Sequence, residues 1–331
     1  MFEDRSPAKP TTASLRVGFI GAGAVAELHL LALERIPQSR VVGFFDPNPT
    51  VSRQREELWR IPSYPTAEAL LDSVDAVFIL SPVESHERYV LSAINRRLPV
   101  LVEKPVAHDL AALTRIREAA EQAQMFVMPG HNYIYNPELE MIQRNLCNET
   151  FGRVYAYAVH YTIYHDEELA RHYPGILRQV IPHHLYTLLY LGFTPAQVVA
   201  MTSNLHYQSL DRDDHAALLM QAKDGTMATA FAGFATDDLS HDPWTFHIKI
   251  LAERGAASFS WHTGVSNHVR GTHPMAYLPY EESYYQEDRF FVQFCKTPGV
   301  MPLSTVSDAQ TVERIINAAE KSVRTGHVVQ I

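Results

Sequence analysis

The segment LRVGFIGAGAVA, Leu15 to Ala26, decides how the N-terminal part of the chain folds. Its apolar run ends at Gly21, and a helical pattern follows from Ala24 to Arg35. A buried strand, a glycine turn and a helix in this order are typical of a dinucleotide-binding Rossmann fold. Gly21 permits the tight turn, and Gly23 lets a pyrophosphate approach the N–H groups at the helix N-terminus. The alternative is a glycine turn in an α/β domain that binds no nucleotide. The predicted phosphate-binding residues are Gly21, Gly23, Ala24 and Val25.

Asp46 supports the nucleotide-binding interpretation. It ends the next apolar run, about twenty residues further along the chain, where Rossmann domains carry an acidic residue. A carboxylate there accepts hydrogen bonds from the ribose hydroxyls of adenosine and repels a 2′-phosphate. Pro47 and Asn48 follow it, not an arginine. The sequence therefore predicts NAD, in preference to NADP, as the cofactor.

The first 130 residues alternate short apolar runs with amphipathic stretches such as Leu110 to Ala123. Further apolar runs lie at Val41 to Phe45, Val74 to Leu80, Pro99 to Val102 and Met125 to Met128. Buried strands that alternate with helices indicate a doubly wound parallel sheet. We therefore expect an α/β protein that begins with a Rossmann domain.

Beyond about Asn132 the pattern changes to strands joined by hairpins. The predicted strands are Val154 to Ile163, Val198 to His206, His215 to Ala222, Thr226 to Phe234, Phe246 to Ala252 and Ala256 to Trp261. Asp224-Gly225 and Arg254-Gly255 suit tight turns, which need residues that accept positive φ. Helices at Arg178 to Leu191 and Val306 to Val323 are expected to cover one face. The predicted domains are a flexible tail at 1–13, a Rossmann domain at 14–131 and an α+β domain at 132–331.

Charge and cysteine content limit the class of protein. Lys plus Arg number 28 and Asp plus Glu 37, so the net charge is −9. A surface of this sign disfavours nucleic acids and anionic membranes as partners. The two cysteines form no metal-binding spacing and imply no disulfide framework. No apolar run has the roughly 18 residues of a membrane span, and the N-terminus lacks the apolar region of a signal peptide. We expect a cytoplasmic protein with a small-molecule partner.

Two polar clusters follow apolar strands of the predicted parallel sheet. Ser81-Pro82 and His86 form the first cluster, and Glu103-Lys104-Pro105 form the second. Ligands of such sheets lie beyond the carboxyl ends of the strands. The predicted cofactor contacts therefore include Ser81, Pro82, His86, Glu103 and Lys104. A lysine at Lys104 can reach a substrate hydroxyl beside the nicotinamide, although a solvated lysine after a strand is the common alternative.

His183 and His184 lie together on a predicted helix whose leucines form its packed stripe. A histidine can exchange a proton near neutral pH, as alcohol oxidation requires. A pair of buried histidines with purely structural hydrogen bonds is the alternative. The chain has 17 histidines, yet it has no HExxH sequence and no closely spaced Cys/His set. We therefore predict no metal site.

These signals, in this order, resemble the Gfo/Idh/MocA family, which comprises glucose–fructose oxidoreductase, inositol dehydrogenase and their relatives. The resemblance extends over nearly the whole chain. It includes Gly21 to Ala26, Glu103-Lys104-Pro105, Asn132 to Pro137, the helix with His184, and Ala318 to Gly326. It implies a Rossmann domain and a C-terminal α+β domain with an open, mostly antiparallel sheet. It also implies NAD(P)-dependent oxidation or reduction of sugars or cyclitols, and a homo-oligomer formed through the C-terminal sheet.

The resemblance implies catalytic roles for two residues. Lys104 matches the lysine that binds and polarises the reacting hydroxyl, and His184 matches the proton-transfer histidine of an Asp-x-x-x-His-x-x-Asp helix motif. The two aspartates of that motif fall on Val180 and Thr187. Pro182 replaces the usual glycine, and Tyr133 stands where many members have arginine.

The sequence thus predicts an NAD-dependent oxidoreductase that acts on a secondary alcohol or ketone of a sugar-like or cyclitol-like molecule. The expected substrate-binding residues are Tyr133, Tyr161, Tyr164 and His183. Two alternatives stay open. One is a reductase of an imine or another unsaturated compound, for which a helix without the carboxylates is natural. The other is a non-catalytic NAD-binding regulator, which would need neither Lys104 nor His184.

Overall fold

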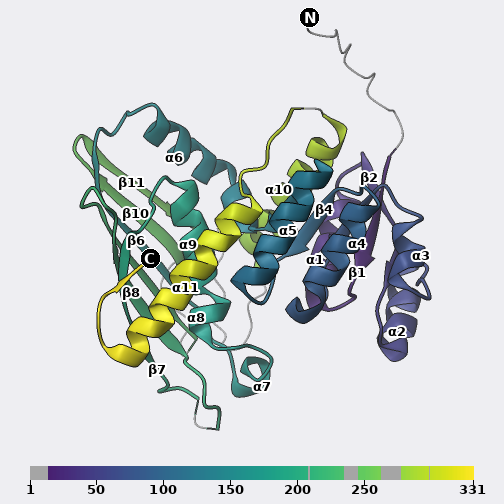
Figure 1. Cartoon of the computed structure of the whole chain (residues 1–331), viewed down its shortest axis with the longest axis horizontal. Coiled ribbons are helices and arrows are strands. Elements are labelled where there is room, and N and C mark those ends of the chain that lie inside the picture. Colours follow the sequence, from purple (N-terminus) through teal and green to yellow (C-terminus); the bar gives the residue numbers. More distant parts are fainter. Residues whose placement is uncertain (1–13, 208, 235–244, 262–276, 298) are drawn as a thin grey trace, which may run out of the picture. The chain divides into compact units, whose positions relative to one another are not determined.

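The computed structural model describes residues 14–207, 209–234, 245–261, 277–297 and 299–331 (Figure 1). The tail predicted at 1–13 lies outside these residues. The chain forms two compact units. Unit 1 comprises Met1–Asn132 and Glu281–Ala309, and unit 2 comprises Tyr133–Tyr280 and Gln310–Ile331. The sequence prediction placed 281–309 with the second domain, whereas their contacts place them in unit 1. Within the described residues, no helix combines the length and the apolar character that a bilayer crossing requires.

Unit 1 is built on a parallel sheet. Its strands are β1 (Leu15–Ile20), β2 (Ser39–Phe45), β3 (Ala76–Ile79), β4 (Val100–Glu103) and β5 (Val127–Gly130), in the order β2-β1-β3-β4-β5. Every neighbouring pair is parallel, so the predicted Rossmann-type sheet is confirmed. The strand order reverses between β1 and β3, and ligands of such sheets bind at this reversal. The helices are α1 (Ala24–Glu34), α2 (Pro49–Trp59), α3 (Ala67–Leu71), α4 (His86–Asn95), α5 (Leu110–Ala123) and α10 (Tyr277–Lys296), the last from Glu281 onward.

Alternating residues of the short strands form two apolar layers. Ile20 and Ile79 belong to the cluster that α3, α4 and α5 cover. Phe19 and Phe78 point to the opposite face, where Phe291 of α10 packs edge-on against Phe78 at 5.0 Å between ring centroids. Because both faces of the sheet are covered, the inner strands β3 and β4 are buried along their whole length, which is why the sequence showed them as continuous apolar runs.

Unit 2 is built on a mostly antiparallel sheet. Its order is β11-β10-β6-β9-β8-β7-β12, and only the β6–β9 pair is parallel. The strands are β6 (Val154–Thr162), β7 (Gln197–Ser203), β8 (His215–Gln221), β9 (Met227–Gly233), β10 (Thr245–Ala252), β11 (Gly255–Ser260) and β12 (Val329–Gln330). The predicted C-terminal α+β architecture is confirmed. The short strand β12 was not predicted.

Helices pack on one face of this sheet (Figure 1). They are α8 (Ile176–Gln179), α9 (Ile181–Tyr190) and, from Gln310 onward, α11 (Val306–Thr325), while α6 (Pro137–Cys147) and α7 (Glu167–Ala170) complete the unit. The single helix predicted at Arg178 to Leu191 is wrong, because the chain forms two helices that meet at Val180. Pro182 has no N–H to donate and lies in the first turn of α9, where that loss costs nothing.

Arg178 joins α8 to α11. Its guanidinium lies 2.6 Å from Glu320 and 3.3 Å from Glu313, and it also donates to the side-chain oxygen of Asn317 at 3.0 Å. These contacts fix the short helix that precedes the two histidines of α9.

Candidate functional site

The glycine loop of unit 1 has the geometry that a pyrophosphate needs. Gly21 has φ +99°, and a Cβ there would lie 2.6 Å from the backbone of Leu80 and Ser81, so only glycine fits. Gly23 is the N-cap of α1, and among the described residues a Cβ at Gly23 would meet nothing within 4 Å. Within the same residues, no side chain caps the helix. The first N–H groups of α1, at Ala24 and Val25, therefore remain for an anion.

Asp46 lies against this loop. Its Oδ2 accepts a hydrogen bond from the Ala22 N–H at 3.0 Å, and its Oδ1 accepts one from the Asn48 N–H at 2.9 Å. Each carboxylate oxygen has a second lone pair, which can accept a ribose hydroxyl. Arg55 on α2, which sequence reasoning did not single out, donates to the Ala22 carbonyl oxygen at 3.1 Å and pairs with Glu27 at 3.1 Å. The NAD-binding residues predicted around β1 and β2 thus lie together.

His86 bridges the two polar clusters predicted after β3 and β4. One ring nitrogen, Nε2, lies 2.6 Å from the Ser81 carbonyl oxygen, and the other, Nδ1, lies 2.9 Å from the Pro105 carbonyl oxygen. The side chain is buried, and burial lowers its pKa. The structure therefore brings both clusters together around the His86 ring.

Lys104 follows the end of β4 at a cis peptide bond to Pro105. The buried Glu103 carboxylate accepts the Lys104 N–H through Oε2 at 2.8 Å. Burial lowers the pKa of Lys104, and the charge of Glu103 opposes this shift. His131 is buried nearby with its Nδ1 2.7 Å from Ser304 Oγ, and burial together with the charge of Lys104 lowers its pKa to about 3.

His184 lies in unit 2, on α9, and is fully buried. Its Nε2 lies 3.0 Å from the carbonyl oxygen of Phe231 on β9, so Nε2 carries the proton. Among the described residues, its Nδ1 has no hydrogen-bond partner. Burial lowers the pKa of His184 to about 4, which keeps the ring neutral at pH 7. The ring therefore offers one unprotonated nitrogen.

His183 belongs to an aromatic cluster of unit 2. Its ring stacks on Tyr133 at 4.3 Å between centroids, and its Nδ1 lies 2.6 Å from Tyr186 Oη. Phe246 and Trp261 each pack against Tyr133 at 4.8 Å. Sequence reasoning missed Tyr186, although its position three residues after His183 on one helix was a usable signal.

The remaining predicted substrate residues are divided between two places. Tyr161 lies near this cluster, with its ring 6.3 Å from that of His184. Tyr164 packs instead against His206 at 5.4 Å. Unit 2 thus brings together Tyr133, Tyr161, His183 and His184, but Tyr164 has a separate ring partner.

Both parts of the chain match models of one protein family. Residues 15–131 match an oxidoreductase family with an NAD-binding Rossmann fold, GFO/IDH/MocA, and residues 140–258 match the GFO/IDH/MocA C-terminal domain. Glucose-6-phosphate 3-dehydrogenase of Bacillus subtilis is 27% identical over 146 residues, which are 44% of this chain and 42% of that protein. Inositol 2-dehydrogenase of Acidothermus cellulolyticus is 33% identical over 147 residues, or 43% of each. The chain therefore matches less than half the length of these relatives.

A solved structure is similar over almost the whole chain. It is scyllo-inositol dehydrogenase of Lactobacillus casei with bound NAD(H) and scyllo-inositol, with a TM-score of 0.82 and 18% identity over 96% of this chain and 99% of that one. At this identity the likeness establishes the fold. The two family matches lead to one conclusion: the chain belongs to the Gfo/Idh/MocA family of oxidoreductases, and its first unit carries an NAD-binding Rossmann domain.

Proposed function

We propose that the protein is an NAD-dependent oxidoreductase that transfers a hydride between nicotinamide and a secondary alcohol or ketone of a sugar-like or cyclitol-like substrate. One observation carries the proposal. The carboxyl ends of β1, β3 and β4 bring Gly21, Ser81 and Lys104 to one edge of the sheet. A phosphate-binding loop and a lysine at the same edge of the sheet suit a cofactor and a substrate oxygen that lie side by side. The names of the sugar and inositol dehydrogenases it resembles support the substrate class.

The bound cofactor supplies a carbon that takes or gives the hydride. In oxidation, the ammonium of Lys104 donates a hydrogen bond to the substrate oxygen and stabilises the negative charge that develops there. His184 accepts the hydroxyl proton through Nδ1, since its Nε2 is already used by the Phe231 carbonyl. Reduction runs these transfers backward. Tyr133, Tyr161, Tyr164 and His183 are proposed to contact the substrate.

The reductase of an imine or another unsaturated compound remains the second candidate. His184 lacks a neighbouring carboxylate at Val180, and burial lowers its pKa to about 4. Both features make it a weaker base than the usual motif would give. The aromatic rings around Tyr133 also suit a substrate with few hydroxyls.

A substrate panel tests the proposal directly. Sugars, cyclitols, their keto forms and cyclic imines are each mixed with the protein and NAD or NADH, and NADH absorbance is followed. We expect turnover of at least one polyol or its ketone, and a much lower kcat/KM for Lys104→Ala. Turnover of imines alone would select the second candidate. Tight NADH binding without turnover of any compound would favour a regulator.

We also propose a cytoplasmic homo-oligomer that associates through the sheet of unit 2. The face opposite the helices presents exposed apolar side chains, including Met201 (75% exposed), Leu219 (41%) and Met227 (39%). Exposed apolar patches on a sheet commonly mark interfaces. Sedimentation of the protein should give more than one chain per particle, and Leu219→Glu should shift it toward monomer. An unchanged particle would place the interface elsewhere.

A further inference from the structure

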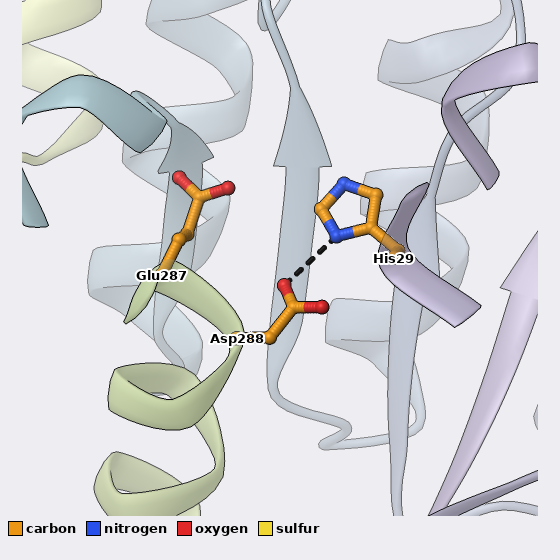
Figure 2. A group of neighbouring side chains, drawn as sticks. All are labelled: His29, Glu287 and Asp288. Atoms are coloured by element: carbon orange, nitrogen blue, oxygen red, sulfur yellow. Dashed lines mark hydrogen bonds and ion pairs between the residues drawn. The ribbon is translucent and has the colours of Figure 1, made fainter. Parts of the chain in front are cut away.

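Unit 1 contains a buried cluster of ionisable side chains that the proposed reaction does not use. His29 lies on α1, Glu103 at the end of β4, and Glu287 and Asp288 on α10. Figure 2 shows His29 and Asp288 facing each other, with Glu287 beside them. Three of the four residues are 0% exposed and Glu103 is 8% exposed. Burial of charged groups is costly unless they are paired, so their arrangement needs a reason.

A path of three contacts runs from Asp288 through His29 and Glu103 to the Lys104 backbone, and its middle contact, between His29 and Glu103, is an ion pair and not a hydrogen bond. His29 Nδ1 lies 2.8 Å from Asp288 Oδ1, and His29 Nε2 lies 3.5 Å from Glu103 Oε1. The other oxygen of Glu103, Oε2, accepts the Lys104 N–H at 2.8 Å. Phe78 and Tyr284 pack edge-on against the His29 ring, at 5.2 and 4.9 Å between centroids, and hold its orientation.

Two carboxylates set the protonation of His29. Burial alone would lower the pKa of His29, but Asp288 and Glu103 together raise it, so His29 is an imidazolium at neutral pH. Burial raises the pKa of Glu287 well above its usual range, so burial opposes ionisation of that side chain. The Glu103 carboxylate faces the His29 imidazolium through Oε1 and the Lys104 backbone N–H through Oε2.

The alternative interpretation of the cluster is a metal-binding site. His29, Glu287 and Asp288 place one ligand atom each within 4.8 Å of one another. However, the 2.8 Å between His29 Nδ1 and Asp288 Oδ1 is a hydrogen-bond distance, and an imidazolium with its proton on Nδ1 has no lone pair for a metal there. The geometry therefore places a proton, not a metal ion, between His29 Nδ1 and Asp288 Oδ1.

We propose that His29, held by Asp288, is a positioning residue: it fixes the Glu103 carboxylate and, through it, the turn that carries Lys104. Without the imidazolium, Glu103 Oε1 would lose the positive charge that lies 3.5 Å away, and we expect the carboxylate to turn away from the Lys104 N–H. The value of this positioning for catalysis rests on the proposed function of Lys104. The positioning itself is a property of the fold and is measurable without substrate.

The test is hydrogen exchange of the Lys104 amide in His29→Gln. If His29 holds Glu103, the Lys104 N–H loses its acceptor and exchanges at least about tenfold faster. The Ala22 amide is an internal control, because it also donates to a carboxylate, Asp46, in the same unit but lies off the path. It should keep its rate, whereas general loosening of unit 1 would speed both amides. His108→Gln is the matched control variant, since His108 is a half-exposed histidine of the same unit.

A double variant locates the effect on Glu103. Glu103→Ala should speed the Lys104 amide as much as His29→Gln does, and the two changes together should add nothing further. If His29→Gln folds poorly, Asp288→Asn tests the same proposal, because it weakens the contact that holds His29. It should speed exchange of the Lys104 amide by a smaller factor. An unchanged Lys104 amide in a folded His29→Gln protein, or fully additive effects, would overturn the proposal.

Turnover distinguishes this inference from the proposed function. If both hold, His29→Gln lowers kcat by about tenfold or more while the NADH Kd changes little. If the Lys104 amide exchanges faster but turnover of an identified substrate is normal, the positioning stands and the catalytic role of Lys104 fails.

Discussion

His184 donates from Nε2 to the carbonyl oxygen of Phe231 at 3.0 Å, a contact between helix α9 and strand β9 that leaves Nδ1 as the nitrogen able to take a proton. Replacement of His184 by Asn keeps an amide donor near that carbonyl but removes the basic nitrogen. We expect the fold and NADH affinity to persist, and turnover to fall by about 10²–10⁴-fold, the usual contribution of general acid–base catalysis. Steady-state kinetics beside NADH titration would measure this.

His183→Asn is the matched comparison. His183 is one residue earlier, about 100° around the helix, and it contacts Tyr133 and Tyr186 instead. Its loss should raise KM more than it lowers kcat. If His183→Asn proves the more damaging change to kcat, the proton-transfer role belongs to His183.

The buried histidines also predict how stability depends on pH. The pKa values of His184 and His131 fall to about 4 and about 3 in the folded protein, below the value of about 6.5 in an unfolded chain. The unfolded chain therefore binds more protons at these two positions at acid pH, so their contribution to stability is full above pH 6.5 and declines as the pH falls toward these values. Each histidine contributes a slope of up to about 1.4 kcal/mol per pH unit.

Urea unfolding at several pH values between 7 and 4.5 measures that slope. His131→Asn should show a shallower decline than the unmodified protein over this range. His108→Asn is the matched control, because it makes the same change at an exposed histidine of unit 1. Equal slopes in all three proteins would contradict the assignment of buried neutral rings.

The two loop glycines should respond differently to alanine. Gly21→Ala forces a Cβ to 2.6 Å from the Leu80 and Ser81 backbone at a positive φ, so it should lower Tm and abolish NADH binding. Gly23→Ala meets no neighbour among the described residues, so Tm should hold. NADH binding should nevertheless weaken, because the methyl group occupies the path of the pyrophosphate. Calorimetry and NADH fluorescence titration would separate the two effects, and normal NADH binding by Gly23→Ala would contradict the assigned phosphate position.

Cofactor preference rests on Asp46. Asp46→Ser removes the charge that repels a 2′-phosphate, and it also removes the acceptors of the Ala22 and Asn48 N–H groups. Affinity for NADH should fall while that for NADPH rises relative to it. Titration of both cofactors into both proteins measures this, and tighter NADPH binding by the unmodified protein would show that Asp46 does not set the preference.

The features that could be predicted from the sequence are those that a local pattern of residues determines. Apolar runs that end in glycine or polar residues gave the strands of unit 1, and the spacing of Gly21, Gly23 and Asp46 indicated the nucleotide loop, because each feature depends on neighbours in the chain. The chain passes back into unit 1 at Glu281–Ala309, and no local feature of the sequence indicates this. His29 and Asp288 are 259 residues apart, and nothing near either residue indicates the other. The break between α8 and α9 at Val180 did have a local signal. Pro182 favours the first turn of a helix, whereas the prediction of one helix from Arg178 to Leu191 puts it in the interior.

Lys104 is the residue on which the proposed reaction most depends. Lys104→Ala removes a charged donor that would face the substrate oxygen in a low-dielectric site, and one such preorganised donor is typically worth about 2.7–4 kcal/mol in the transition state. We therefore expect kcat/KM to fall by about two to three orders of magnitude, with the NADH Kd much less affected. Lys223→Ala, at an exposed lysine of unit 2, is the control and should be normal. Lys104→Arg keeps the charge but changes the shape of the donor, so it should recover only part of the loss. Near-normal turnover by Lys104→Ala on an identified substrate would show that Lys104 is a solvated turn residue.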